Sequence, residues 1–562
     1  MQHVCWWCAL MARRALRSAA LALLVVSFAG AAFAEEGGSE GDEGAQCRLH
    51  AELSVERQLR RLSLDLRGYG PEYEEHAAVE GKQVVPEAII DELLDSDDFR
   101  IQMRRFHESL LWPNLDGVNL YFYRFGLVPT VLSPQTTVWS LSAGAARQAY
   151  RGGDRTHICQ DKPQSELGWD AQGVPLSEAM GTDSQGPWVA EGWVELSPYW
   201  APETTIRACA FDAQETPSYT QDGQSYPCGV RDASPGACGC GPNLRHCWHP
   251  NHDNSVVNAM QEQLLLLVDD YTDGSRAYSG LITTKRTHYN GVLMHWRKYQ
   301  ASTLPFSRAF NDYTPDDGDF PAEAQWNDGK WYEVERKGAH SGILTLPAYT
   351  MRFPTNRARA NRFRTVFTGQ YFQSPDLADY EGCDPNSNDL VKRCICRKCH
   401  QTLEPLAAYF GQVAKSGSAL LSNFAQDYKN TTACNGGNAG PASGNFCNRF
   451  YERVPSEIDP DYILWRLRPL AYADSEHPYV QKNFDAGPRG IADWAIDSGL
   501  FARATVKNLF SFLYHREMRL DPTAQPSEVA LLEELSAEFA KHDNFKLLAK
   551  RLVMLPQYRR MP

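Results

Sequence analysis

The sequence predicts a mainly α-helical protein with long irregular loops, in which helical N- and C-terminal modules flank a disulfide-rich middle region with short strands. Two observations support this fold class. Near both ends of the chain, apolar residues recur at the spacing of amphipathic helices. Between these parts lies a stretch rich in Gly, Pro, Trp and Cys, which has little helical periodicity.

Composition and periodicity divide the chain into segments, and the number of independent domains stays open. In order, the segments are a signal peptide (1–34), an acidic Gly-rich linker (35–48), an N-terminal helical module (49–115), a Cys/Trp/Gly-rich loop region (116–254), a module with a Cys-x-x-Cys-His motif (255–425), a connecting region (426–500) and a C-terminal helical module (501–562).

The first 34 residues have the form of a secretory signal peptide. Arg13, Arg14 and Arg17 precede the apolar stretch 21–30, and a small-residue cleavage site ends at Ala34. The apolar core is shorter than the roughly 20 residues that a bilayer-spanning helix needs. We therefore expect a periplasmic or otherwise exported protein with no transmembrane segment after signal cleavage. Either of two methionines, at positions 1 and 11, could be the true start.

The formal net charge is -13, and removing residues 1–34 makes it more negative because that segment contains arginines and no acids. Nucleic acid and anionic membrane surfaces attract basic proteins, so an acidic protein is not expected to bind either of them.

Two amphipathic helices are expected in the N-terminal module, over about 55–66 and 99–110. Gly68 and Gly70 are expected to end the first, and Ser96 to cap the second. Further along, a helix is expected over about 255–269, and residues 339–369 should become helical only after Pro354. Apolar stripes predict three C-terminal helices, near 506–513, 531–539 and 545–552.

The chain has 15 cysteines, most of which should form disulfides in an exported protein. Proximity suggests two pairs, Cys383 with Cys394 and Cys434 with Cys447, although sequence alone does not fix connectivity. In the middle region, His246, His249 and His252 with Cys247 could bind a metal, but a disulfide with surface histidines is the favoured interpretation. The tryptophans there could stack on sugars, although packing is favoured, and they include Trp188, Trp193 and Trp200.

Residues Cys396-Arg397-Lys398-Cys399-His400 form the attachment motif for a c-type haem. Two thiols at this spacing can add to the two vinyl groups of one porphyrin, and the adjacent imidazole can bind the iron as its proximal ligand. The motif therefore predicts one covalent haem c, held by Cys396, Cys399 and His400. A disulfide and a zinc site are the two alternatives.

The sixth iron ligand can come from anywhere in the chain, because the fold places it. The candidates are Met351, His340, His515 and Met518, of which Met351 is favoured. A methionine would favour electron transfer, whereas an open position would permit binding of a small molecule or peroxide chemistry.

Three blocks of the sequence resemble a family of large exported cytochrome c-like proteins of planctomycetes and related bacteria, which are built from domains of unknown function. The blocks are RRLSLDLRGYGPEYEE with the later DELLDSDDFR, then HSGILTLPAYTMRF with NRARANRFR and CRKCHQTLEPLAAYF, and finally VKNLFSFLYHREM with NFKLLAKRLVMLPQYRR. They cover roughly half the chain. The resemblance implies that Cys396, Cys399 and His400 hold the haem, and that Leu403-Glu404-Pro405 forms a turn after the motif. It implies no substrate.

We therefore expect a monohaem c-type cytochrome-like protein that transfers single electrons to or from a redox partner protein. The basic residues around the motif could steer such a partner or contact the haem propionates, or could be an ordinary solvated face; they are Lys392, Arg393, Arg397 and Lys398. Two other functions stay open. One is a haem-dependent oxidoreductase with an open iron site, and the other is a surface protein that binds a polymer or partner and carries an accessory haem. Catalytic residues and oligomeric state are not predicted.

Overall fold

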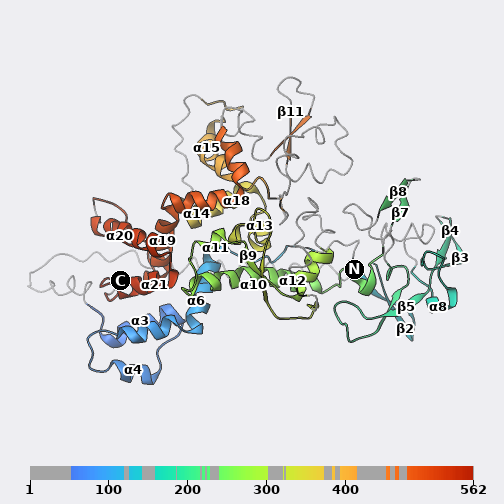
Figure 1. The fold of residues 1–562 in the computed structure, drawn as a ribbon, viewed down its shortest axis with the longest axis horizontal. Coiled ribbons are helices and arrows are strands. Elements are labelled where there is room, and N and C mark those ends of the chain that lie inside the picture. The colour runs from blue at the N-terminus through green and yellow to red at the C-terminus, as the bar shows by residue number, and fades with distance from the viewer. Residues whose placement is uncertain are drawn as a thin grey trace, which may run out of the picture. The chain divides into compact units, whose positions relative to one another are not determined.

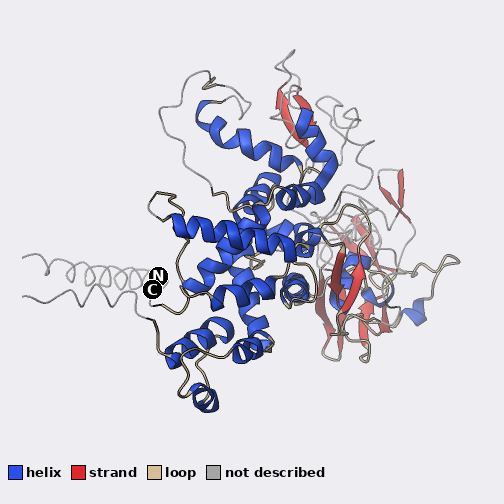
Figure 2. Cartoon of the chain, turned by 60° about the vertical axis from the view of Figure 1, so that its left-hand side comes forward, coloured by secondary structure: helices blue, strands red, loops and turns tan. Residues whose placement is uncertain are grey.

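A computed structural model of the chain describes residues 52–118, 120, 126–141, 158–184, 186–214, 218–221, 224–227, 239–300, 321, 324–371, 383–386, 393–413, 420, 451–455, 463–467, 478–523 and 525–560. It is about half helical, with 14% strand in small sheets, so the mainly α prediction is confirmed in outline (Figure 2). The expected signal peptide, the linker and the pair Cys434–Cys447 lie outside the described residues.

The N-terminal part consists of α3 (Val55–Arg67), α4 (Tyr73–Val79), α5 (Glu87–Leu94) and α6 (Asp97–Leu111). Both predicted helices are confirmed. Gly68 ends α3 with a left-handed φ of 87°, and the Ser96 hydroxyl caps α6 by accepting a hydrogen bond from the Phe99 N–H at 3.1 Å. The short helices α4 and α5 were not predicted.

The middle region contains short strands, as expected. Strands β1 (Leu127–Ser133), β2 (Thr136–Leu141), β6 (Ile206–Cys209) and β5 (Trp193–Leu196) form one sheet in that order. The β2–β6 pair is parallel and the others are antiparallel. Helix α8 (Gln164–Leu167) lies before two hairpins, β3 (Glu178–Asp183) with β4 (Gly186–Ala190) and β7 (Ser218–Gln221) with β8 (Gln224–Pro227). Disulfides join Cys159 to Cys209 and Cys240 to Cys247.

The central part follows the 3₁₀ turn η3 (Pro242–Leu244). It contains α10 (His252–Thr272), α11 (Gly280–Thr283), β9 (Arg286–Tyr289), α12 (Gly291–His295), η4 (Trp296–Gln300), β10 (Tyr332–Glu335), η8 (Gly342–Thr345), α13 (Pro347–Arg352), α14 (Asn356–Phe367) and α15 (Cys394–Ala408). Strand β10 pairs with β9. The prediction that residues 339–369 become helical only after Pro354 is wrong, because α13 precedes that proline. Pro347 opens α13, where a missing N–H costs no hydrogen bond.

The C-terminal part begins with the paired strands β11 (Tyr451–Pro455) and β12 (Ile463–Leu467). The helices α18 (Pro478–Asp497), α19 (Leu500–Tyr514), α20 (Pro526–His542) and α21 (Phe545–Met554) follow. The three predicted C-terminal helices correspond to α19, α20 and α21. Helix α18 lies in the connecting region (426–500), for which no element was predicted.

One hydrophobic core contains apolar side chains from both ends of the chain. Leu59 and Phe106 come from the N-terminal helices, and Phe510 and Phe545 from the C-terminal ones. Helices α6 and α21 both pack on α10 (Figure 1). Helix α5 packs on α21. In the described part of the chain, no helix combines the length and apolarity that crossing a membrane requires.

Candidate functional site

Helix α15 carries the Cys-x-x-Cys-His motif in its first two turns. The Cys383–Cys394 disulfide, which the sequence predicted, ties the first residue of the helix to the preceding segment. An isolated bridge between Asp384 and Arg393 holds the same junction. Because residues three and four apart share one face of a helix, Cys396, Cys399 and His400 lie on a common side of α15.

The two cysteines of the motif are free thiols, and both are partly exposed. Every other cysteine in the described ranges belongs to one of the three disulfides. The structure therefore does not contain the alternative disulfide between Cys396 and Cys399. Among the described residues, these thiols and His400 also do not converge closely enough to hold a single metal ion. That arrangement does not favour the zinc alternative.

A buried carboxylate orients His400. The His400 Nδ1 lies 2.5 Å from Oε1 of Glu404, one helical turn later, and Glu404 is only 1% exposed. Arg357 of α14 donates from Nε to the same oxygen at 2.6 Å. An ionised carboxylate only accepts hydrogen bonds, so Nδ1 of His400 carries the proton and Nε2 carries the lone pair.

The predicted turn at Leu403-Glu404-Pro405 is wrong, because α15 continues through Pro405 to Ala408. A proline inside a helix removes one backbone hydrogen bond. Here, packing of α15 between α14 and α18 keeps the helix intact. The side chain of Asn483 from α18 donates to the Pro405 carbonyl at 3.0 Å. The helical backbone is what places Glu404 four residues after His400, within reach of its ring.

The structure does not bring the candidate sixth ligands to His400 by any contact among the described residues. Met351 of α13 and Met518 are both buried in the hydrophobic core. His340 is buried, with Nδ1 3.2 Å from the Thr345 hydroxyl. The His515 side chain is 72% exposed, and its Nε2 lies 2.9 Å from Asp65.

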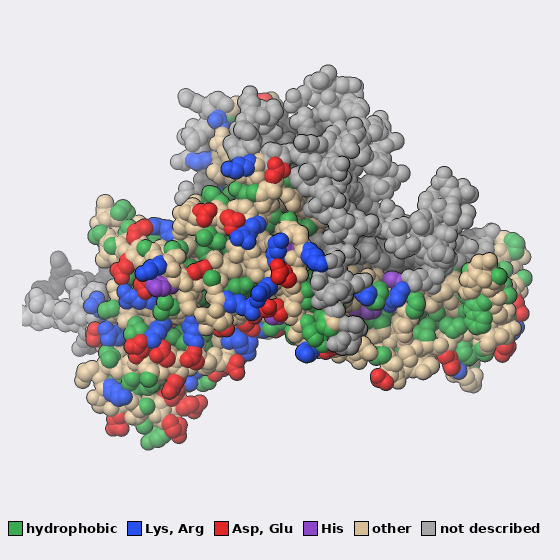
Figure 3. Space-filling view, in the orientation of Figure 1, with side chains coloured by type: hydrophobic (Ala, Val, Ile, Leu, Met, Phe, Trp, Pro, Cys, Tyr) green, Lys and Arg blue, Asp and Glu red, His purple; other side chains and the backbone are tan. Residues whose placement is uncertain are grey.

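Several basic residues of the motif segment are described. Arg393 and Lys398 are exposed, and Arg397 is half-buried, whereas Lys392 lies outside the described residues. Figure 3 shows Lys and Arg side chains over the part of the molecule that contains α14 and α15. This end of α15 therefore carries positive charge on a protein that is acidic overall.

Two functional side chains were missed from the sequence. Glu404 stands four residues after His400, so helical spacing could have identified it if the segment had been taken as a helix. Arg357 is 47 residues away from Glu404 in the chain, and no local pattern connects the two.

The histidines of the middle region do not form the predicted surface group. Cys247 is in a disulfide, which confirms the favoured interpretation for that residue and removes it as a thiolate ligand. The rings of His249 and His252 stack at 4.3 Å, and His252 also stacks on Trp326 at 4.6 Å. Both histidines are half-buried, and burial lowers the pKa of His252 to about 3. They are part of an aromatic cluster.

Trp188, Trp193 and Trp200 of the middle region are all half-buried. Trp200 lies 5.5 Å from Trp139 and 4.9 Å from His249, measured between ring centroids. The guanidinium of Arg207 covers Trp193 at 4.3 Å. This agrees with packing as the favoured interpretation.

A group of potential metal ligands also occurs at Asp270, His288 and Glu333. Its charges are matched by arginines. Arg276 contacts both carboxylates, and Arg286 donates to Glu333 at 3.1 Å. The His288 ring donates to Asp270 at 2.7 Å. These contacts account for the group without an ion.

Comparison of the chain with models of protein families, with curated proteins and with solved structures found no match. The resemblance to exported cytochrome c-like proteins therefore stays a prediction that rests on the quoted sequence blocks.

Proposed function

We propose that the protein is an exported monohaem c-type cytochrome-like protein that transfers single electrons. The observation that carries this proposal is the pair of free thiols on α15, beside His400, in a chain whose other described cysteines are all oxidised. A disulfide-forming environment would not favour two neighbouring reduced thiols without a reason, and covalent attachment of haem is such a reason.

The residues at the site fit a haem c. Cys396 and Cys399 supply the two thiols that the porphyrin vinyl groups require, and His400 supplies an imidazole with a fixed tautomer. When bound, the haem supplies a one-electron Fe(III)/Fe(II) couple. The protein then sets the electronic properties of its ligand. Glu404 holds the Nδ1 proton of His400, which raises the basicity of Nε2, and Arg357 keeps the carboxylate in place.

Export is part of the proposal. Three disulfides in the described residues are consistent with an oxidising compartment. We propose that residues 1–34 are the signal peptide, that the protein acts in the periplasm or beyond it, and that a redox partner with an acidic surface approaches the basic start of α15.

The test is an optical spectrum of the purified mature protein, oxidised and reduced, with a denaturing gel stained for covalent haem. The wild type should retain haem on the gel and show sharp low-spin bands when reduced. A Cys396→Ala, Cys399→Ala variant should lose it. A matched control, Cys383→Ala with Cys394→Ala, removes two neighbouring cysteines and should keep it. Wild type without haem after expression with a working maturation system would contradict the proposal.

A second candidate is a haem-dependent oxidoreductase with an open iron site. The specific observation in its favour is the buried Glu404 carboxylate, because an electron-rich proximal ligand favours cleavage of an O–O bond as well as electron transfer. A high-spin spectrum and binding of cyanide by the wild type would favour this candidate over the electron carrier.

A further inference from the structure

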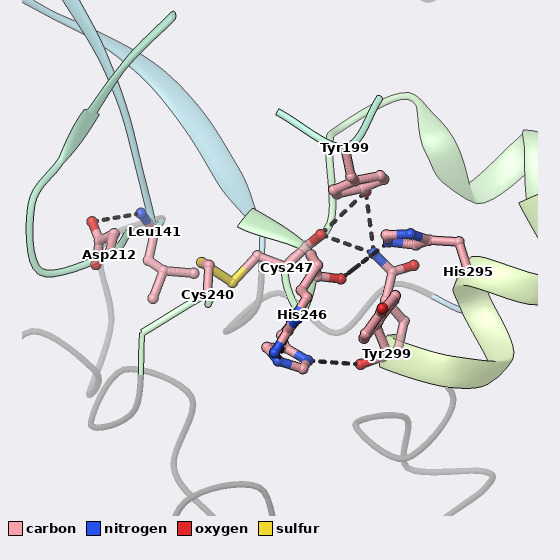
Figure 4. The surroundings of a disulfide bond; sticks show 10 residues. Leu141, Tyr199, Asp212, Cys240, His246, Cys247, His295 and Tyr299 are labelled. Atoms are coloured by element: carbon pink, nitrogen blue, oxygen red, sulfur yellow. Dashed lines mark hydrogen bonds between the residues drawn. A yellow bond between two sulfur atoms is a disulfide. The ribbon is translucent and has the colours of Figure 1, made fainter. Parts of the chain in front are cut away.

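A cavity of about 340 Å³ lies in the central part of the chain, next to the Cys240–Cys247 disulfide. Its lining comes from four parts of the chain, within 198–202, 242–245 and 294–299 and at 321 with 324–326. Figure 4 shows Tyr199, His295 and Tyr299 on one side of the disulfide, with Leu141 and Asp212 on the other. The volume lies within the range of sites for small organic ligands.

Hydrogen bonds hold one wall of this cavity in place. Gln300 donates from Nε2 to the Tyr199 hydroxyl at 3.1 Å and to the Cys247 carbonyl at 3.0 Å. The Tyr199 hydroxyl donates to the same carbonyl at 3.2 Å. The disulfide fixes Cys247 itself, so the wall is rigid before any ligand binds. A preformed wall lowers the entropy cost of binding.

The walls are flat and largely aromatic. Tyr199 and Trp326 are both 8% exposed, and the His295 ring stacks on Tyr199 at 4.1 Å. The ring of Tyr299 also lines the cavity, with four prolines and the side chains of Asn243, Met294, Ala324 and Gln325; the prolines are Pro198, Pro202, Pro242 and Pro321. Such surfaces favour a planar, ring-shaped ligand.

The charge of the lining is positive. The described residues that line the cavity include no Asp or Glu, although the whole chain has a net charge of -13. Lys298 lies with Nζ 5.4 Å from the centroid of Tyr299, and the Arg245 guanidinium lies 5.0 Å from it. Both cations therefore flank the same aromatic ring. An anionic group on the ligand would be attracted to this side of the cavity.

His295 adds a neutral polar group. Its Nε2 lies 3.1 Å from the Arg245 carbonyl, so that nitrogen carries a proton. Burial lowers the pKa of His295 to about 3, and the ring is therefore uncharged at neutral pH. In the neutral ring, Nδ1 is an acceptor for a hydroxyl group.

We propose that this cavity is a binding site for a small aromatic carboxylate. The ring of the ligand lies between the aromatic walls, its carboxylate faces Lys298 and Arg245, and a ring hydroxyl can donate to His295. The site is separate from the motif on α15 and does not depend on the proposed haem.

Titration calorimetry of the full-length mature protein tests this proposal, with 4-hydroxybenzoate as the probe. The uncharged analogue 4-hydroxybenzyl alcohol should bind more weakly, because it lacks the carboxylate. In a Lys298→Ala variant, the Kd for 4-hydroxybenzoate should rise about fivefold, as expected for loss of one exposed charge contact. The side chain of Lys298 is exposed, so the variant should fold normally.

Lys82→Ala, at an exposed lysine outside the lining, is the matched control and should leave the Kd unchanged. A Tyr299→Leu variant removes the ring that both cations flank and should weaken binding of the acid more than binding of the alcohol. The proposal is overturned if millimolar 4-hydroxybenzoate does not bind, if acid and alcohol bind equally, or if Lys298→Ala binds like the wild type.

Discussion

Glu404 joins two helices through a single carboxylate oxygen, which accepts from Arg357 of α14 and from His400 of α15. In Glu404→Gln, the side chain keeps its size but loses its negative charge. His400 then becomes a weaker electron donor, so the reduction potential of the haem-loaded protein should become more positive. Redox titration followed by the optical spectrum measures this shift.

Glu92→Gln removes an exposed carboxylate on α5 and serves as the control. An unchanged potential in Glu404→Gln, with haem still attached, would show that the carboxylate does not tune the ligand. A wild-type protein that carries no haem would instead contradict the proposed function itself.

A buried histidine gives the protein a predictable response to acid. His107 of α6 is fully buried, with Nδ1 2.7 Å from the Met103 carbonyl and Nε2 2.9 Å from the Tyr278 hydroxyl. Burial lowers its pKa from 6.5 to about 4. The imidazole of His107 therefore binds a proton more readily in the unfolded chain than in the folded one. The unfolding free energy falls as the pH drops from about 6.5 to about 4.

The loss from this one group is about 3 kcal/mol when complete. A His107→Gln variant can make the same two hydrogen bonds but does not titrate, so its unfolding free energy should fall less steeply over this pH range. Urea unfolding at several pH values measures the difference, with the exposed His76→Gln as the control. Equal slopes for wild type and His107→Gln would rule out this role for His107.

At this scale, the sequence revealed only what is adjacent in the chain. Cys396, Cys399 and His400 stand within one short motif, so the sequence could suggest a shared role for them. Glu404 needed knowledge that the helix continues through a proline, and Arg357 needed knowledge of how α14 packs on α15. The cavity beside Tyr199 could not be predicted either, since four separated segments form it.

The end of α3 offers a test at the scale of one helix. Gly68 has a φ of 87°, and a Cβ there would lie 1.8 Å from Nε2 of the Gln102 side chain. Gly68→Ala should therefore lower the unfolding free energy by about 1–2 kcal/mol. Gly70 has open space around it and no left-handed φ, so Gly70→Ala is the matched control. Equal stability of the two variants in urea would contradict this account.

Two of the helices that were missed, α13 and α18, have sequences in which a helix is hard to recognise. Residues of α13 are buried on nearly all sides, so its sequence shows no periodic alternation between polar and apolar residues. Helix α18 contains Gly487 and Pro488, and Gly487 has non-helical backbone angles that mark a kink. Glycine and proline are typical of loops, but here tertiary packing keeps both residues within a helix.

On the scale of the whole molecule, the two ends of the chain stabilise each other. Lys550 of α21 forms ion pairs with Glu87 and Asp91 of α5, and Phe545 lies 6.0 Å from Phe106 of α6. A chain that stops before Pro526 loses α20 and α21 and exposes the apolar faces of α5, α6 and α10. In limited proteolysis, its helices α3–α6 should be cleaved much faster than in the full-length chain.

A Lys550→Ala variant keeps α20 and α21 and loses only exposed ion pairs. Its helices α3–α6 should therefore resist proteolysis about as well as those of the wild type. Full protection of α3–α6 in the shortened chain would show that the N-terminal helices fold without the C-terminal ones. The sequence indicated helical modules at each end, but it could not show that they share one core, because contacts across the whole chain leave no local pattern.

The Cys383–Cys394 disulfide has a consequence for how the protein is assembled. Its second cysteine is two residues before Cys396, so one cysteine of the oxidised pair and both cysteines of the reduced pair lie in the first two turns of α15. Exchange among neighbouring thiols is fast when they can reach one another, and a wrong pair would occupy a cysteine of the motif. If Cys396 and Cys399 attach haem as proposed, both must stay free of disulfides with Cys383 and Cys394 until the attachment is made. Under the proposed function, the compartment that oxidises the other cysteines would then also have to supply a reductant for these two thiols.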